Sequence, residues 1–181
     1  AEEYLLEVGR RHITVTASTP QAVLHGLRSL QQLVAGGEIP ACIVRDKPTF
    51  AYRGAMLDVC RHFFPTEDVK TYIDILSLHK INKFHWHLTD DQGWRIEIKK
   101  YPELTRVGSV RKETLIGHHH TSNEYDKTPH SGYYTQKQIR EIVKYAADRY
   151  VTVIPEIELP GHAVAALTSY PWLGCRGEGY E

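Results

Sequence analysis

Residues 83–94 (KFHWHLTDDQGW) combine several titratable side chains with the alternating pattern of a buried strand. Bulky apolar side chains alternate with two histidines and a threonine, and a strand places such alternate residues on opposite faces. Two adjacent carboxylates, Asp90 and Asp91, follow at the predicted carboxyl end. Buried polar groups are costly unless they are paired, so this concentration of them indicates an active-site strand rather than a purely structural one.

Two further segments carry the same kinds of side chain. Residues 58–65 (DVCRHFFP) include Arg61, and residues 156–162 (EIELPGH) include Glu158 and His162. Each segment follows a predicted strand, and parallel neighbours bring their carboxyl ends to one edge of a sheet. We therefore expect a single patch that holds an arginine, several carboxylates and several histidines.

Each of these residues also has a structural interpretation. Arg61 could belong to an ordinary ion pair, Glu156 could brace the interior of the sheet, and His162 could be a loop histidine. His85 and His87 are expected to be buried, hydrogen-bonded groups rather than metal ligands. The functional interpretation rests on three separate strands that deliver the same residue types to the same end.

The elements that must position these residues form two groups. The predicted elements of the first group are strands at 4–8 and 12–16 joined as a hairpin, a helix from Thr19-Pro20 to Gly36-Gly37, and a strand within 42–50. Val23, Leu27, Leu30 and Val34 are expected to form the buried stripe of that helix. A domain boundary is expected near Lys47-Pro48.

From residue 49 onward, strands and helices alternate. The predicted elements are strands at 55–59, 81–88 and 151–157, a helix capped by Thr66, a long loop from about Asp90 to Tyr134, and a helix opened by the capping box of Thr135 and Gln138. This order is typical of a parallel sheet and fits either an open α/β sheet or a (β/α)₈ barrel. None of these predicted strands is followed by a glycine-rich phosphate loop, which weighs against nucleotide binding.

The composition excludes several classes of protein. Acidic and basic residues balance at 22 each among 181 residues, so neither a nucleic-acid partner nor a charged membrane surface is implied. The cysteines Cys42, Cys60 and Cys175 are too few and too scattered for a disulfide framework. No apolar run is long enough to span a bilayer, and no signal peptide is present. Ala1 and Glu181 both interrupt continuing patterns, so we expect both ends to be cuts.

Three motifs together resemble those of family-20 glycoside hydrolases, the β-N-acetylhexosaminidases. The motifs are Arg53-Gly54-Ala55-Met56-Leu57-Asp58 with Arg61-His62, then HWHLTDDQGW at 85–94, then PEIELPGH at 155–162. They follow the family's order on successive strands, and the resemblance covers about residues 50 to 175. The first 48 or so residues resemble the end of the small α/β domain that precedes the family's barrel.

The resemblance implies two parts. Residues 1–48 would be the C-terminal part of a small α/β, or α+β, N-terminal domain. Residues 49–181 would be a truncated catalytic barrel with the first three βα units of a TIM (β/α)₈ fold. A complete barrel needs eight strands and about 250 residues, so we expect the barrel to be incomplete in this chain.

The resemblance also implies a function, the removal of terminal β-linked N-acetylglucosamine or N-acetylgalactosamine from glycans or chitin oligomers. In the family's substrate-assisted, retaining mechanism, the acetamido oxygen of the sugar attacks the anomeric carbon while a glutamic acid protonates the leaving oxygen. By resemblance, Arg61 would bind sugar hydroxyls, and Asp90 and His162 would orient and tune that acid. Asp91 and Glu158 would be nearby substrate-binding partners, and neither a metal nor another cofactor is implied.

The sequence departs from the family in one respect. The catalytic Asp-Glu pair lies in a Gly-Gly-Asp-Glu type of motif on the family's fourth strand, which this sequence lacks. Gly177-Glu178-Gly179 is no substitute, because no strand is predicted before it. We therefore expect the 181 residues alone to be inactive, although the parent protein is active. Three strands cannot close a barrel, so we expect an exposed sheet edge through which chains could associate.

Other functions remain open at this stage. A metal-dependent hydrolase could use His85 and His87, which have a ligand-like spacing with acids nearby. A non-catalytic carbohydrate-binding module could be built on a decayed barrel, and a generic α/β domain could carry its polar strand ends by coincidence. The family resemblance further implies export, to a periplasmic, extracellular or lysosomal location.

Overall fold

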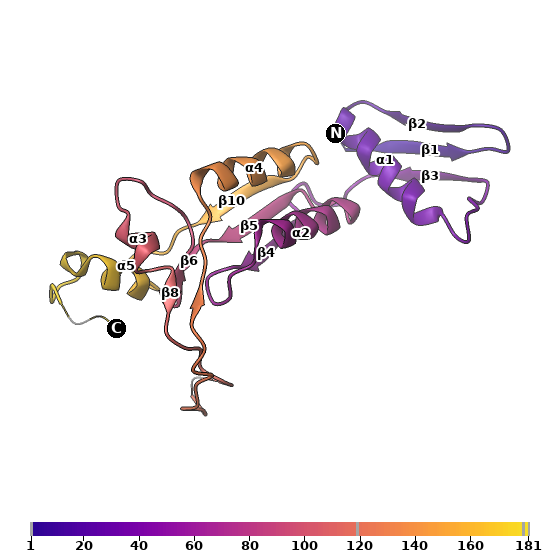
Figure 1. The fold of residues 1–181 in the computed structure, drawn as a ribbon. Helices are drawn as coiled ribbons and strands as arrows, with labels where there is room; N and C mark the ends of the chain where they lie inside the picture. Colours follow the sequence, from indigo (N-terminus) through magenta and orange to yellow (C-terminus); the bar gives the residue numbers. More distant parts are fainter. Residues whose placement is uncertain (1, 119, 179, 181) are drawn as a thin grey trace.

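The computed structural model describes residues 2–118, 120–178 and 180. His119 and Gly179, which belong to the histidine run at 118–120 and the glycine motif at 177–179, lie outside the described residues, as do the two terminal residues. Figure 1 shows a small α/β unit at the N-terminal end of the chain, followed by a larger unit that carries three parallel strands.

The small unit is a three-stranded antiparallel sheet with one helix. Its elements are β1 (Tyr4–Val8), β2 (Ile13–Ala17), α1 (Pro20–Leu33) and β3 (Cys42–Asp46), with strand order β2-β1-β3. The predicted hairpin is confirmed, because β1 pairs antiparallel with β2. The predicted start of the helix is also confirmed, because the Thr19 hydroxyl accepts a hydrogen bond from the backbone N–H of Ala22 at 3.2 Å.

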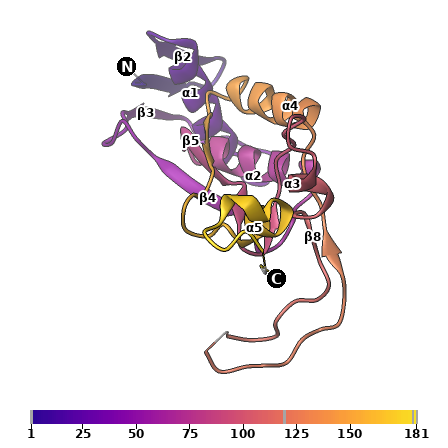
Figure 2. The same cartoon turned by 90° about the vertical axis from the view of Figure 1, so that its left-hand side faces the viewer.

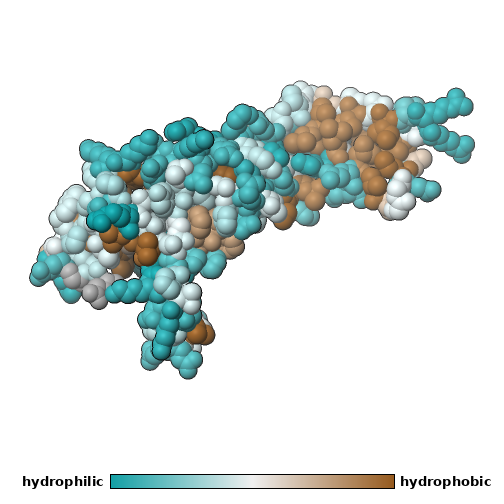
Figure 3. Space-filling model, viewed as in Figure 1, coloured by the Kyte–Doolittle hydropathy of each residue, from teal (hydrophilic) through white to brown (hydrophobic). Residues whose placement is uncertain are grey.

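The predicted buried stripe of α1 is partly wrong. Leu27 and Val34 are 47% and 48% exposed. The helix instead turns Ala22 and Gly26 toward the sheet, since a Cβ on Gly26 would come within 2.6 Å of Val15. Small residues at this contact let helix and sheet approach closely and leave the larger residues outside, and Figure 3 shows an apolar surface over this unit.

The larger unit contains a three-stranded parallel sheet covered by two helices. Its main elements are β4 (Gly54–Asp58), α2 (Thr66–Leu78), β5 (Lys83–His87), α4 (Gln136–Ala147) and β10 (Thr152–Glu156), with strand order β10-β5-β4. The predicted alternation of strands and helices is therefore confirmed as an unclosed, mixed α/β arrangement. The predicted capping box at Thr135 and Gln138 is present. The Thr66 cap is wrong, since Pro65 occupies the N-cap position and Thr66 is the first helical residue.

The core of the larger unit lies between β5 and the two helices. Phe84 and Trp86 are fully buried and pack with Val69 and Ile73 of α2 and with Ile142 of α4. This confirms the predicted division of the strand, in which the bulky side chains face the helices. The histidines at positions 85 and 87 therefore lie on the opposite face of the sheet, away from the helices.

The predicted long loop between β5 and α4 contains several short elements. They are β6 (Thr89–Asp90), β7 (Gly93–Trp94), α3 (Glu103–Arg106), β8 (Val110–Arg111) and β9 (His130–Ser131). After β10 come α5 (Val164–Ser169) and a 3₁₀ turn at Pro171–Leu173. Residues 110–118 and 120–131 form an arm that projects from the body of the molecule in Figures 1 and 2. Within the part of the chain that is described, no helix combines the length and apolarity needed to cross a bilayer.

Exposed apolar side chains lie on one outer strand of the parallel sheet and directly after the other. Met56 of β4 is 49% exposed, and Ile157, which follows β10, is 44% exposed. Unpaired strand edges of this kind favour association with another strand. Association of chains through this edge stays a prediction.

Lys80 joins the two units. Its ammonium group donates hydrogen bonds to the Tyr4 hydroxyl at 2.8 Å, to the Ser29 hydroxyl at 2.7 Å and to the Asp46 carboxylate at 2.6 Å. The hydrogen bond from Lys80 lowers the pKa of Asp46 from its ordinary value. Lys80 also has a positive φ of 58°, a conformation that side-chain-bearing residues rarely adopt. The contact with the small unit thus holds the turn between α2 and β5 in place.

Replacing Lys80 by Met should weaken this contact by about 1–2 kcal/mol, because a charged donor with three acceptors is lost. Hydrogen exchange of the backbone amides in β1 and β3 of the whole protein measures the effect. Lys144→Met is the matched control, since the Lys144–Asp148 ion pair lies on the surface with the lysine side chain 75% exposed. Equal protection in both variants would contradict the assigned role of Lys80.

Candidate functional site

The carboxyl ends of the three parallel strands carry polar side chains in one row. His87 at the end of β5 lies opposite Glu156 of β10 on one side and opposite Asp58 of β4 on the other. The register therefore brings together three segments that are far apart in the sequence, as the pattern predicts. The chain after each strand supplies the remaining groups of the site.

Asp90 lies at the centre of the candidate site and its side chain is completely buried. One carboxylate oxygen, Oδ2, lies 2.7 Å from Arg61 Nη2 and 3.1 Å from His87 Nε2. The other, Oδ1, accepts a hydrogen bond from the backbone N–H of Asp91 at 2.7 Å and lies 3.3 Å from His162 Nδ1. The structure thus gathers Arg61, Asp90 and His162, which the sequence predicts to converge, around one carboxylate.

Arg61 is held by three side chains. Its Nε donates to Gln92 at 3.1 Å, its Nη1 donates to Asp58 at 2.7 Å, and its Nη2 pairs with Asp90. Burial opposes ionisation of Asp58, but the Arg61 guanidinium and the backbone N–H groups of Arg61 and Cys60 outweigh it and lower the pKa of Asp58. The arginine side chain is 44% exposed, and a guanidinium carries more N–H donors than these three contacts use. The remaining donors are available to a ligand.

Asp91 connects the site to α5. Its Oδ1 accepts a hydrogen bond from the backbone N–H of Val164 at 3.0 Å, at the start of that helix. Its Oδ2 lies 3.6 Å from His162 Nδ1, so His162 faces both adjacent carboxylates. His162 has a positive φ of 51° and a side chain that is 55% exposed. The residue therefore reaches from Asp90 toward solvent at the mouth of the site.

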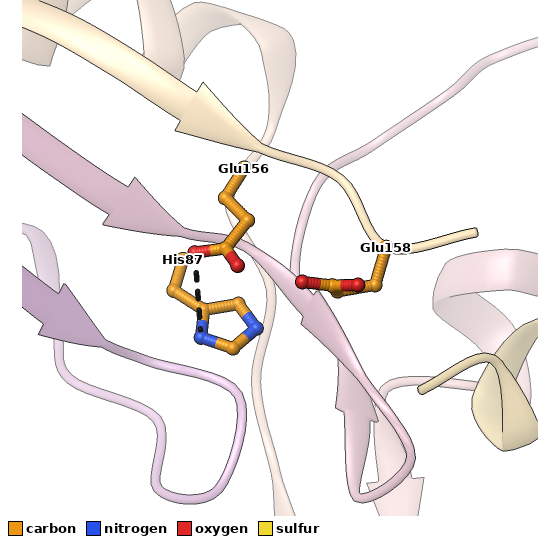
Figure 4. Close-up of side chains that lie close together, drawn as sticks. All are labelled: His87, Glu156 and Glu158. Atoms are coloured by element: carbon orange, nitrogen blue, oxygen red, sulfur yellow. Dashed lines mark ion pairs between the residues drawn. The ribbon is translucent and has the colours of Figure 1, made fainter. Parts of the chain in front are cut away.

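Glu158 joins a second cluster beside Asp90, formed with Glu156 and His87 (Figure 4). The hydrogen bond with Glu156 raises the pKa of Glu158. Burial opposes ionisation of Glu156, but that hydrogen bond and the neighbouring His87 and His85 lower its pKa. Of the two carboxyl groups, Glu158 is therefore the more easily protonated. His85 Nε2 lies 2.5 Å from the Glu156 carboxylate on the other side.

Two sets of donors in the described part of the chain could hold a metal ion. They are His87, Glu156 and Glu158, and Asp90, Asp91 and His162, each with its donor atoms within 4.8 Å of one another. Imidazole with carboxylates suits zinc and other divalent metals. Both sets, however, already have partners, since His85 contacts Glu156 and Arg61 contacts Asp90. His85, which the metal-hydrolase alternative would use, belongs to neither set.

Arg95 is the most important residue of this region that the sequence does not single out. It is completely buried and donates hydrogen bonds to the carbonyl oxygens of Val59, Cys60, Ser109 and Gly132 at 2.7–3.1 Å. Burial lowers the pKa of Arg95 to about 10, so the group remains charged near neutral pH. These bonds fix the chain just before Arg61 and both ends of the arm. In the sequence, only the position of Arg95 shortly after the Asp90-Asp91 pair could have indicated a role.

Gln92 and Asp58 are also parts of the site to which the sequence analysis assigns no separate role. Both bind Arg61, and Gln92 does so across 31 positions of sequence. Their positions beside Asp91 and at the end of β4 are the only sequence signals, and neither signal indicates an arginine partner. The site therefore contains more polar groups than the predicted set.

The sequence matches two models of one protein family. Residues 1–47 match the model "Glycosyl hydrolase family 20, domain 2", and residues 50–181 match "Glycosyl hydrolase family 20, catalytic domain". A β-hexosaminidase of Porphyromonas gingivalis is 48% identical over 96% of this chain, and one of Vibrio furnissii is 47% identical over 94%. The crystal structure of an exo β-N-acetylglucosaminidase from Vibrio harveyi, in complex with N-acetylglucosamine, superposes with a TM-score of 0.84 at 40% identity over 95% of this chain.

This chain corresponds to only part of those proteins. It spans 22% of the Porphyromonas protein, 28% of the Vibrio furnissii protein and 28% of the Vibrio harveyi chain. The similarity thus covers nearly all of the residues described above but about a quarter of each relative.

Replacing Arg95 by Met should lower the free energy of unfolding by about 3 kcal/mol or more, because four buried carbonyl groups lose a charged donor. Lysine should restore little of it, since one ammonium group cannot reach four carbonyls in the way a guanidinium fork does. Urea unfolding of the whole protein measures the loss. Arg106→Met is the control, because Arg106 is 75% exposed in a surface ion pair. A loss no larger than that of the control would refute the role given to Arg95.

Proposed function

The chain belongs to glycosyl hydrolase family 20, and we propose that the whole protein hydrolyses terminal β-linked N-acetylglucosamine or N-acetylgalactosamine from glycans or chitin oligomers. In this proposal the parallel sheet is the first part of a (β/α)₈ catalytic barrel over residues 49–181, preceded by the C-terminal part of a small α/β domain over residues 1–48. The observation that carries the proposal is the convergence of Arg61 and His162 on the buried Asp90. The N-acetylglucosamine complex of the Vibrio harveyi relative supports the sugar.

Each group has a role in the proposed reaction. The exposed side of Arg61 donates hydrogen bonds to sugar hydroxyls, because a guanidinium is a donor only. Asp90 accepts from His162 and holds its ring, and His162 orients and tunes the acid that protonates the leaving oxygen. Asp91 fixes the start of α5 beside that ring, while Glu158 lines the neighbouring side as a substrate-binding partner.

The mechanism needs a glutamic acid and an aspartate outside these 181 residues. The acetamido oxygen of the sugar acts as the nucleophile, so the protein has to supply the proton for the leaving group and a carboxylate that orients the acetamide. Neither cluster of the described chain offers a Gly-Gly-Asp-Glu segment. We assign both groups to the rest of the whole protein.

A metal-dependent hydrolase is the second candidate, favoured by the two donor sets that lie within 4.8 Å. A carbohydrate-binding module without activity is the third. Chelation separates the second candidate from the first, because a substrate-assisted glycosidase keeps its activity without metal. A whole protein that binds N-acetylglucosamine without turnover would be a binding module.

In the whole protein, Asp90→Asn should reduce kcat for a chromogenic N-acetylglucosaminide by about 100-fold, because the acid loses the support of an oriented His162. Asp148→Asn is the control, since Asp148 is a surface carboxylate that is 57% exposed and pairs only with Lys144 at the end of α4 among the ion pairs of the described residues. Steady-state kinetics with chelator present provide the measurement. Wild-type kcat in Asp90→Asn would remove the main support for the proposed site.

The 181 residues expressed alone should give no turnover of the same substrate, because the acid and the acetamide-orienting carboxylate are missing. The assay compares this chain with the whole protein at equal molar concentration. Robust hydrolysis by the isolated chain would show that its own carboxyl groups suffice and would overturn the proposed division of labour.

A further inference from the structure

The proposed function leaves a line of polar side chains unused. His85 contacts Glu156, Glu156 contacts His87, and His87 contacts the Thr89-Asp90 turn. This line runs along the face of β5 that points away from the helices. His87 is the buried member of the line, and burying a polar group is costly unless it is paired, which raises the question of what His87 does for Asp90.

The orientation of the His87 ring follows from its neighbours. Nε2 forms a hydrogen bond with the carbonyl oxygen of Thr89 at 3.1 Å and lies 3.1 Å from Asp90 Oδ2. A carbonyl and a carboxylate can only accept, so the proton of the ring resides on Nε2. His87 therefore donates its N–H to the Thr89 carbonyl oxygen, one residue before Asp90, and its side chain is only 6% exposed.

The opposite ring nitrogen faces a carboxylate. Nδ1 of His87 lies 3.6 Å from Glu156 Oε2, and His85 Nε2 lies 2.5 Å from the same oxygen. Glu156 thus lies between His85 and His87.

Thr89 receives a second restraint. Its hydroxyl oxygen accepts a hydrogen bond from the backbone N–H of Glu158 at 2.8 Å. The turn that carries Asp90 is therefore held by β5 through His87 and by the chain after β10 through Glu158. Removing the His87 N–H would leave only the second of these restraints.

We propose that His87 is a positioning residue of the glycosidase site, which holds the Thr89-Asp90 turn so that Asp90 can orient His162. This inference rests on the proposed function. The side chains that contact one another in this arrangement are His85, Glu156 and His87, and the last of them lies beside Asp90. A divalent cation bound by His87, Glu156 and Glu158 is the alternative use of the same side chains (Figure 4). We favour the positioning role, because His85 already contacts Glu156 and His87 Nε2 is already bonded to the Thr89 carbonyl oxygen.

The first experiment compares His87→Met and His87→Gln in the whole protein. Methionine removes the donor, so kcat should fall roughly 10- to 100-fold while KM changes much less. Glutamine can place an amide N–H near the position of Nε2 and should retain more of the activity. His79→Met is the matched control, because His79 is exposed at the other end of the sheet, after α2.

The pH profile separates positioning from a general loss of structure. The acidic limb of kcat/KM should move in His87→Met, since a displaced Asp90 no longer orients the His162 that tunes the acid. The titratable and charged groups that face His87 are Asp58, Arg61, His85, Asp90, Glu156 and Glu158. A mere loss of folded protein lowers the rate at every pH without moving the limb.

A second measurement does not depend on turnover. Nitrogen NMR of the His87 ring in the whole protein should find Nε2 protonated, and an unprotonated Nε2 would overturn the inference. Wild-type kcat and an unmoved pH profile in His87→Met would also overturn it, as would one equivalent of zinc that is lost with activity on chelation. If the wild-type protein gives no turnover, the proposed function fails, and the NMR result still decides the placement of His87.

Discussion

The site depends on one electrostatic constraint, the complete burial of the Asp90 carboxylate. An ionised carboxylate out of water must be compensated by donors or cations, and here Arg61, His87, His162 and a backbone N–H surround it. These partners come from three strand ends, so the parallel register of the sheet is the condition for bringing them to Asp90. The same contacts fix the directions of Arg61 and His162. A structural requirement and the proposed chemistry are thus met by one set of contacts.

Arg95 is a buried cation, so its charge also has to be compensated within the protein. Its buried guanidinium is compensated by backbone carbonyl oxygens instead of carboxylates, so it binds chain segments without neutralising the charges of the site. A carboxylate partner for Arg95 would compete with Asp58 and Asp90 for Arg61. Carbonyl partners avoid this competition and tie the base of the arm to the segment before Arg61. The buried cation and the buried anion therefore stabilise neighbouring segments without exchanging partners.

Features that depend on local spacing could be predicted from the sequence, and features that depend on distant contacts could not. The period of two places Phe84 and Trp86 against the helices, and the Thr135 capping box needs only its own four residues. Arg95 escapes such analysis because its acceptor on Val59 is 36 positions away. Thr66 was misplaced because Pro65 takes the extended conformation of an N-cap, with ψ of 161°. The barrel came from the family resemblance, since three strands fit an open sheet equally well.

The electrostatics of the second cluster explain why the acid of the proposed reaction has to come from elsewhere. Glu158 is the one carboxyl group among the described residues whose pKa is raised, which by itself suits a proton donor. The first cause of that shift is the hydrogen bond with Glu156, however, and loss of a proton from Glu158 would place two negative charges side by side. A general acid needs a proton that leaves at low cost as the leaving group departs. Glu158 is therefore suited to hold its proton, and His162, exposed at the mouth of the site, is the group that can reach an acid supplied by the rest of the protein.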